Sequence, residues 1–134
     1  PTLKIWDGTK LPFEAAHFDV AFSLASNLIA DQVGFVKEVA RTVAENGEIF
    51  MAYVSPRSGI LSKAEPVGGN CYRLQDDFDE ANFTGLTVFA ATDQNLENLW
   101  QDYFDITINH FEYGGMPYYQ SFQVISGKRN GRTV

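Results

Sequence analysis

The sequence of 134 residues contains one cysteine, Cys71, and few basic residues. A single cysteine excludes an intramolecular disulfide, which suits a reducing cytoplasm. Lys and Arg number 10 against 17 Asp and Glu, which gives a formal net charge of −7. Because phosphate binding needs clustered Lys and Arg, a nucleic-acid partner is not expected.

Long apolar runs and a signal peptide are also missing. No run approaches the roughly 20 apolar residues of a membrane-spanning helix, and the first residues lack the basic start and apolar middle of a secretory signal. We therefore expect a cytoplasmic protein without a membrane partner. The chain is 45% hydrophobic and 14% aromatic. At this length, that composition predicts one globular domain over residues 1–134.

Residues 11–55 predict a strand, a helix and a second strand. Residues 18–24 form a nearly continuous apolar run, as in a parallel strand covered on both faces. Asp31 is a suitable helix N-cap, and Gly47 is expected to end the helix in a left-handed conformation. One apolar stripe at helical spacing comprises Phe35, Val36, Val39, Ala40 and Val43. Strand, helix and strand in this order favour a parallel βαβ unit.

The remaining segments predict further short elements. Residues 3–6 are expected to form a short strand or the end of one, and residues 57–70 a loop with a short helical piece at 61–64. Residues 71–91 predict a hairpin, and a second helix should begin at Thr92 or Asp93. Two further segments, residues 104–111 and 118–126, predict an antiparallel strand pair.

Several short motifs occur in an order known from one family. They are Leu-Pro-Phe at 11–13, Phe-Asp-Val at 18–20, Phe-Val-Lys-Glu-Val-Ala-Arg-Thr-Val at 35–43, and Glu-Asn-Gly-Glu-Ile at 45–49. Together with residues 95–128 they resemble the C-terminal half of class I S-adenosylmethionine-dependent methyltransferases of the type 11-like group. The resemblance implies a truncated Rossmann-like α/β fold with a mixed sheet, in which a parallel βαβ unit precedes a C-terminal antiparallel strand pair.

The family's defining cofactor motif is not found in this sequence. That motif is a GxGxG turn after the first strand, where the backbone approaches the ligand closely; Gly68-Gly69 and Gly114-Gly115 stand in a different context. S-adenosylmethionine is therefore implied by the resemblance alone, and no cofactor is expected for the isolated chain. In the family, the first strand lies beside the fourth, so residues 18–24 should form an exposed edge open to pairing. We expect a homodimer or a complementing cofactor-binding half.

The resemblance and the strand ends together suggest where ligands bind. Asp7 matches the family's acidic position after the third strand, which contacts the adenine end of the cofactor; alternatively, it is a turn residue beside Gly8. Ser23 and Asn27 follow the first predicted strand of the βαβ unit at its C-terminal end, where ligands of open α/β sheets bind. Ser23 is assigned to the cofactor and Asn27 to a substrate, although a loop asparagine equally often caps a turn.

Further substrate-binding candidates are aromatic or hydroxyl-bearing. Tyr53 and Ser55 end the second strand on the same rim, two residues apart and thus on one face; the alternative for Tyr53 is a buried tyrosine with a satisfied hydroxyl. Tyr113 and Tyr118 are amphipathic residues near a Gly-Gly turn. A solvated loop, or a lid by the resemblance, is expected at the acidic residues Asp76, Asp77, Asp79 and Glu80.

No catalytic or metal-binding residue is predicted. Neither His17 nor His110 has a partner at metal-ligand spacing, and no GxSxG or activated cysteine supports a nucleophile. Two functions stay open. The chain is either a non-catalytic, dimeric binding or interaction module, or the substrate-side portion of a small-molecule methyltransferase that needs a cofactor-binding half.

Overall fold

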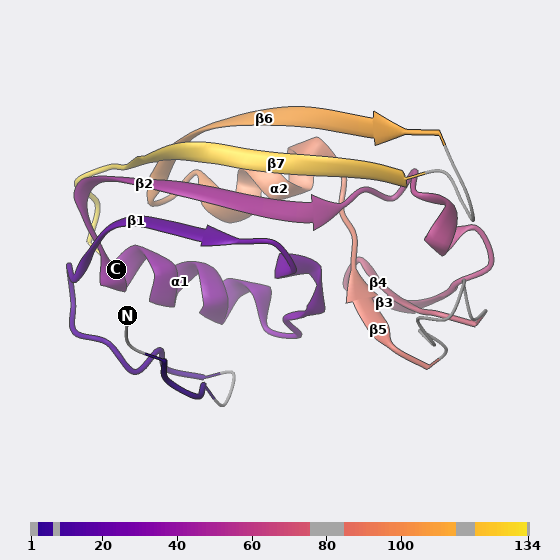
Figure 1. Cartoon of the computed structure of the whole chain (residues 1–134), viewed down its shortest axis with the longest axis horizontal. Helices are drawn as coiled ribbons and strands as arrows, with labels where there is room; N and C mark the ends of the chain where they lie inside the picture. Colours follow the sequence, from indigo (N-terminus) through magenta and orange to yellow (C-terminus); the bar gives the residue numbers. More distant parts are fainter. Residues whose placement is uncertain (1–2, 7–8, 76–84, 115–119, 134) are drawn as a thin grey trace.

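The computed structural model describes residues 3–6, 9–75, 85–114 and 120–133 and contains one main sheet (Figure 1). Its strand order is β1-β2-β7-β6. The four strands are β1 (Phe18–Ser23), β2 (Val43–Val54), β6 (Phe104–Tyr113) and β7 (Gln120–Arg129). β1 runs parallel to β2, whereas β2–β7 and β7–β6 are antiparallel. This mixed sheet confirms the fold class expected from the sequence.

The predicted βαβ unit is present. Helix α1 (Gln32–Thr42) joins β1 to β2, and the Asp31 side chain caps it by accepting a 2.9 Å hydrogen bond from the backbone N–H of Gly34. The capped N–H would otherwise lack an intrahelical partner. All five residues of the predicted apolar stripe are buried, so the helical spacing identified the core-facing side correctly.

The expected role of Gly47 is wrong. The helix ends at Thr42 and β2 continues through Asn46, which itself adopts the positive φ of 64°. A Cβ added to Gly47 would lie 2.6 Å from Val43 Cγ1 and 2.8 Å from the carbonyl oxygen of Ala44. Gly47 is therefore required for close packing of the backbone within β2, and Asn, which tolerates the left-handed region, provides the turn.

The end of α1 is stabilised by the preceding loop instead of a glycine. The carbonyl oxygens of Arg41 and Thr42 accept hydrogen bonds from the backbone N–H groups of Ala16 and His17, each at 2.8 Å. These bonds satisfy carbonyls that a helix end leaves without partners. The chain can thus pass directly from helix to strand at this point.

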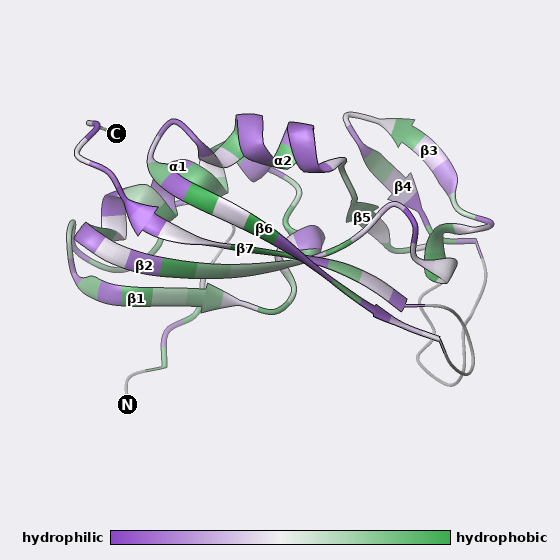
Figure 2. Ribbon diagram, turned by 90° about the horizontal axis from the view of Figure 1, so that it is seen from above, coloured by the Kyte–Doolittle hydropathy of each residue, from purple (hydrophilic) through white to green (hydrophobic). Residues whose placement is uncertain are grey.

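Both helices pack on the same face of the main sheet (Figure 2). Helix α2 (Asp93–Trp100) is capped by Thr92, whose hydroxyl accepts from the Asn95 N–H at 3.3 Å. Its Leu96 and Trp100 are fully buried against α1 and the sheet. Burial of this apolar surface is the main stabilising contribution expected for such a core.

A second, smaller sheet lies beyond the end of β2 (Figure 1). It has the antiparallel order β3-β4-β5, formed by β3 (Glu65–Gly68), β4 (Cys71–Arg73) and β5 (Thr87–Phe89). The predicted hairpin corresponds to β4 and β5. Strand β3 was not expected, because all four of its residues are exposed and it shows no apolar alternation. The acidic residues 76–80 lie outside the described residues.

Two short 3-10 turns connect these parts. They are η1 (Ser26–Leu28), which follows β1, and η2 (Gly59–Leu61), which precedes the small sheet. Residues 3–6 do not form the expected strand, since no strand pairs with them among the described residues. In the same described part of the chain, no helix is long and apolar enough to cross a membrane.

The other face of the main sheet carries exposed apolar side chains on β1 and β2. Val20 and Phe22 of β1 are 52% and 71% exposed, and Phe50, which is paired with Phe22 in the register, is 44% exposed. We call these three residues the open face. Within the described residues, no strand pairs with the outer side of β1, so the strand's backbone hydrogen-bonding groups form one edge of the sheet.

Candidate functional site

Two hollows flank the point where β2 ends. The first, here called the rim hollow, has a volume of about 220 Å³. It lies between η1, the end of β2, the start of β7 and the small sheet. Its lining is mostly apolar and includes Leu28, Val54, Leu74, Val88 and Phe122, with Asn27 and Gln120 among the polar residues. The rim hollow therefore lies at the C-terminal ends of the parallel strands, where open α/β sheets bind ligands.

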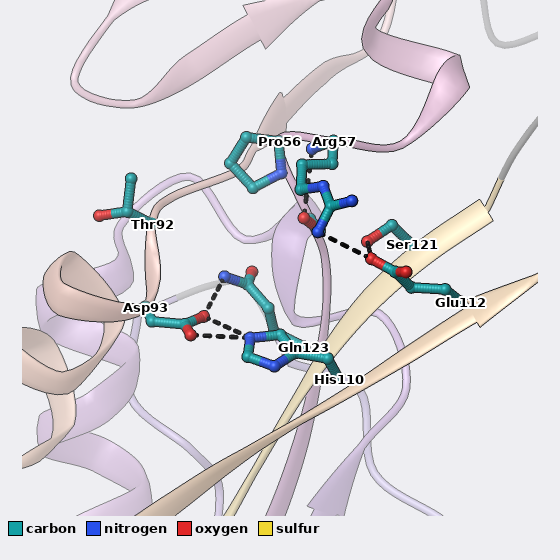
Figure 3. Close-up of a pocket in the computed structure, with 9 residues that line it drawn as sticks. Pro56, Arg57, Thr92, Asp93, His110, Glu112, Ser121 and Gln123 are labelled. Atoms are coloured by element: carbon teal, nitrogen blue, oxygen red, sulfur yellow. Dashed lines mark hydrogen bonds and ion pairs between the residues drawn. The ribbon is translucent and has the colours of Figure 1, made fainter.

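The second hollow, here called the polar hollow, has a volume of about 620 Å³. Its position follows from strand alternation, since successive side chains point to opposite faces of a sheet. Phe122 contributes to the rim hollow, whereas its neighbours Ser121 and Gln123 line the polar hollow on the helix side. The full lining comprises Ser55, Pro56, Arg57, Thr92, Asp93, His110, Glu112, Ser121 and Gln123 (Figure 3).

A histidine–aspartate pair forms one wall of the polar hollow (Figure 3). His110 Nε2 lies 2.9 Å from Oδ1 and 2.7 Å from Oδ2 of Asp93. Because a carboxylate can only accept, Nε2 carries a proton and donates it to Asp93. Partial burial raises the pKa of Asp93, but hydrogen bonds from His110 and Gln123 outweigh it and hold that pKa below its usual value.

Gln123 is 3% exposed, and its amide orientation is fixed by two acceptors. Its Nε2 donates to the carbonyl oxygen of Ala91 at 3.0 Å and to Asp93 Oδ1 at 2.8 Å. The amide oxygen, Oε1, therefore points away from these two acceptors. This Oε1 is buried and has no hydrogen-bond partner among the described residues.

An ion pair forms the opposite wall. Arg57 Nη1 lies 3.0 Å from Glu112 Oε1, and the Ser121 hydroxyl donates to the same oxygen at 3.5 Å (Figure 3). Ser55 contributes its Oγ, which accepts from the Arg57 backbone N–H at 3.2 Å. The polar hollow thus combines one guanidinium with two carboxylates and an imidazole.

Two sequence-predicted residues reach the hollows. Asn27 is 8% exposed and lines the rim hollow, and Ser55 lines the polar hollow. Ser23, at the end of β1, lines neither of them, and Tyr113 is 58% exposed near the end of β6. Asp7 and Tyr118 lie outside the described residues, so their predicted roles stay untested.

Tyr53 is fully buried and also lines neither hollow. Its hydroxyl donates to Gln32 Oε1 at 2.8 Å and accepts from Trp100 Nε1 at 3.1 Å. Burial raises the pKa of Tyr53, and the Trp100 hydrogen bond offsets part of this. Gln32 Nε2 in turn donates to the carbonyl oxygens of Ser26 and Ile29. Tyr53 thereby connects α2 to the η1 turn that carries Asn27.

Sequence reasoning missed His110, Asp93, Glu112 and Gln123 as members of one cluster. His110 was considered as a metal ligand alone. The signal that was present is the two-residue spacing of His110 and Glu112, which places both side chains on one face of β6. Among the described residues, no group of three potential ligands is arranged to hold a metal ion.

One of the two Gly-Gly pairs in the sequence lies wholly within the described residues. Gly68 and Gly69 belong to the β3–β4 turn, and a Cβ added to either would contact nothing within 4 Å. Both have a positive φ, 93° and 61°, which glycine adopts without steric cost. Ser23 is the one predicted cofactor residue that the structure describes.

No protein-family model matches the sequence, and no curated protein matches it. Solved structures do. A methyltransferase from Methanosarcina mazei is 17% identical with a TM-score of 0.69, over 95% of this chain and 66% of its own. One from Thermotoga maritima is 16% identical with a TM-score of 0.64, over 92% and 61%. A third, from Mesorhizobium loti, is 16% identical with a TM-score of 0.63, over 92% and 67%.

Each of these structures is described as an S-adenosylmethionine-dependent methyltransferase. This chain spans about two thirds of their length or slightly less, and identities this low show the fold alone. The result agrees with the motif order in the sequence and with the strand order of the main sheet. The chain therefore has the fold of part of an S-adenosylmethionine-dependent methyltransferase.

Proposed function

We propose that this chain is a methyltransferase-like binding domain that holds a small apolar molecule in the rim hollow, dimerises through β1 and does not transfer methyl groups by itself. The observation that carries the proposal is the rim hollow at the C-terminal ends of β1 and β2. Ligand sites are typically apolar hollows with a few placed polar groups. Asn27 and Gln120 are polar groups of this kind.

The size of the rim hollow limits its ligand. Its volume of about 220 Å³ lies below the roughly 300–1,000 Å³ of sites for drug-sized molecules. A ligand of about one ring is therefore expected, with its apolar surface against Val88 and Phe122 and a polar substituent near Asn27.

A titration with indole tests this part of the proposal. We expect saturable shifts of the Asn27 and Val88 amide resonances in NMR spectra. Leu28→Glu, which places a charge in the lining at a half-exposed position, should weaken binding at least tenfold. Val33→Glu is the matched control, because Val33 is 58% exposed on α1 and does not line the rim hollow. Equal binding by the two variants would contradict the proposal.

The dimer is proposed from the edge of β1 and the open face. Natural edge strands are usually protected by charges, prolines or covering elements, but β1 presents Val20 and Phe22 on its open side, next to Phe50. Antiparallel pairing of two β1 strands would continue the main sheet across a two-fold axis and join the open faces of two copies. The resemblance in the sequence supports the same edge, since the family places a strand there.

Sedimentation velocity at micromolar concentration tests the dimer. Phe22→Glu should give a monomer, whereas Phe111→Glu should not. Phe111 is exposed as well (47%) but lies on β6 at the opposite edge, three strand spacings or roughly 14 Å away. A wild-type monomer would refute dimerisation and favour a complementing half as the occupant of this edge.

The alternative function is the substrate-side portion of a small-molecule methyltransferase. It is favoured by the structural likeness to S-adenosylmethionine-dependent enzymes over 61–67% of their length. Calorimetric titration of S-adenosylmethionine into the chain separates the two functions. We expect no heat of binding from this chain, and micromolar affinity would overturn the non-catalytic assignment.

A further inference from the structure

The polar hollow is separate from the rim hollow and has a different chemistry. We propose that it binds a small organic ammonium ion through the N–H donors of that ion. The inference does not depend on the proposed dimer or on the apolar ligand, because its residues lie on the helix side of the main sheet.

The first argument is a buried hydrogen-bond acceptor that lacks a donor. His110 Nε2 already donates to the Asp93 carboxylate, at 2.9 Å and 2.7 Å from its two oxygens. Gln123 supplies an acceptor, Oε1, which is buried and unpartnered among the described residues. A buried polar atom is costly without a hydrogen bond, so this oxygen indicates that a donor belongs in the hollow.

The second argument is charge. Asp93 and Glu112 are carboxylates, and Arg57 is the one strongly basic side chain in the lining. Arg57 already pairs with Glu112 at 3.0 Å. The lining therefore carries two carboxylates for one strongly basic side chain, within a chain whose formal net charge is −7. This field attracts cations and repels anions.

The third argument concerns the size and kind of cation. The polar hollow has a volume of about 620 Å³, which is within the usual range of small-molecule sites. A bare metal ion is a poor match, since the described residues contain no cluster of three potential metal ligands. An ammonium group offers up to three directed donors, and they can meet Gln123 Oε1 and the carboxylates of the lining.

NMR titration with three probes tests the inference. The probes are 2-phenylethylammonium, its N,N,N-trimethyl analogue and 3-phenylpropionate. They share a phenyl group but differ in N–H donors and charge. We expect millimolar or tighter binding of the primary ammonium, with shifts of the Gln123 side-chain amide and the His110 ring. The trimethyl analogue should bind at least about tenfold more weakly, because charge-assisted hydrogen bonds are lost.

Two charge variants complete the test. Glu112→Gln removes one carboxylate from the hollow and should weaken binding of 2-phenylethylammonium about tenfold. Asp105→Asn removes the same charge from the same strand, at an exposed residue outside the lining, and should leave the affinity unchanged. Absence of binding, equal affinity for the trimethyl analogue, preference for 3-phenylpropionate, or equal effects of the two variants would overturn the inference.

Discussion

Replacing Tyr53 by Phe probes the hydrogen-bond network that supports the rim of the main sheet. The substitution keeps the ring, which is fully buried, and removes one hydroxyl. Two buried partners then lose a hydrogen bond, namely Oε1 of Gln32 and Nε1–H of Trp100. Both side chains are buried, Gln32 at 6% and Trp100 at 0% exposure, so the loss of the hydroxyl leaves two buried polar atoms unpaired.

The magnitude follows from these two groups. A buried donor or acceptor left without a partner costs about 1–3 kcal/mol. Because both a donor and an acceptor are orphaned, Tyr53→Phe should lower the free energy of unfolding by about 2–4 kcal/mol. Domains of this size are usually stable by only about 5–15 kcal/mol, so the loss is large enough to measure easily.

Urea unfolding followed by tryptophan fluorescence measures this loss as a lower midpoint at an unchanged m-value. Tyr103→Phe is the control: Tyr103 is half-buried and its hydroxyl makes no hydrogen bond with the described residues. The control should change stability by less than about 0.5 kcal/mol. If Tyr53→Phe costs no more than the control, Tyr53 is not a structural connector, and its predicted role in ligand binding regains support.

Two further predictions concern α1 and β2. Hydrogen bonding by Arg41 lowers the pKa of Glu38, although partial burial opposes it. The stability that Glu38 contributes is therefore present above the ordinary glutamate pKa of roughly 4.3. It is lost as the pH falls through the lower pKa of the folded state. The urea midpoints of wild type and Glu38→Gln should therefore converge between about pH 5 and pH 3. Gly47→Ala should lower the free energy of unfolding, measured by urea, by about 1–3 kcal/mol. The reason is that the added Cβ would lie 2.8 Å from the carbonyl oxygen of Ala44. A loss below about 0.5 kcal/mol would show that β2 adapts to the added methyl group at little cost.

Local patterns sufficed for the elements that form the core. The apolar stripe of α1 was predicted because helical spacing is a property of neighbouring residues, and Asp31 was predicted because capping acts within three residues. Gly47 was misassigned for a related reason. Asn-Gly is a common turn signal, but which of the two residues takes the positive φ depends on the close contacts of Gly47 within β2.

The candidate site depended on contacts between residues distant in the sequence. His110 and Asp93 are 17 residues apart, and Gln123 reaches Asp93 from 30 residues away. No local pattern encodes such a cluster, because it forms when β6 and β7 pack beside the N-terminus of α2. Asn27 and Ser55 were easier to identify, since residues that follow parallel strands lie on one edge of the sheet whatever the rest of the chain does.

The two hollows are related by the alternation of β7. Phe122 contributes to the apolar rim hollow, whereas Ser121 and Gln123 on either side of it contribute to the polar hollow. A polar residue at 122 would place an unpaired group in the rim hollow, and an apolar residue at 123 would remove the donor that helps to hold Asp93. The alternation of β7 therefore places the proposed apolar site and the proposed cation site on opposite faces of the main sheet.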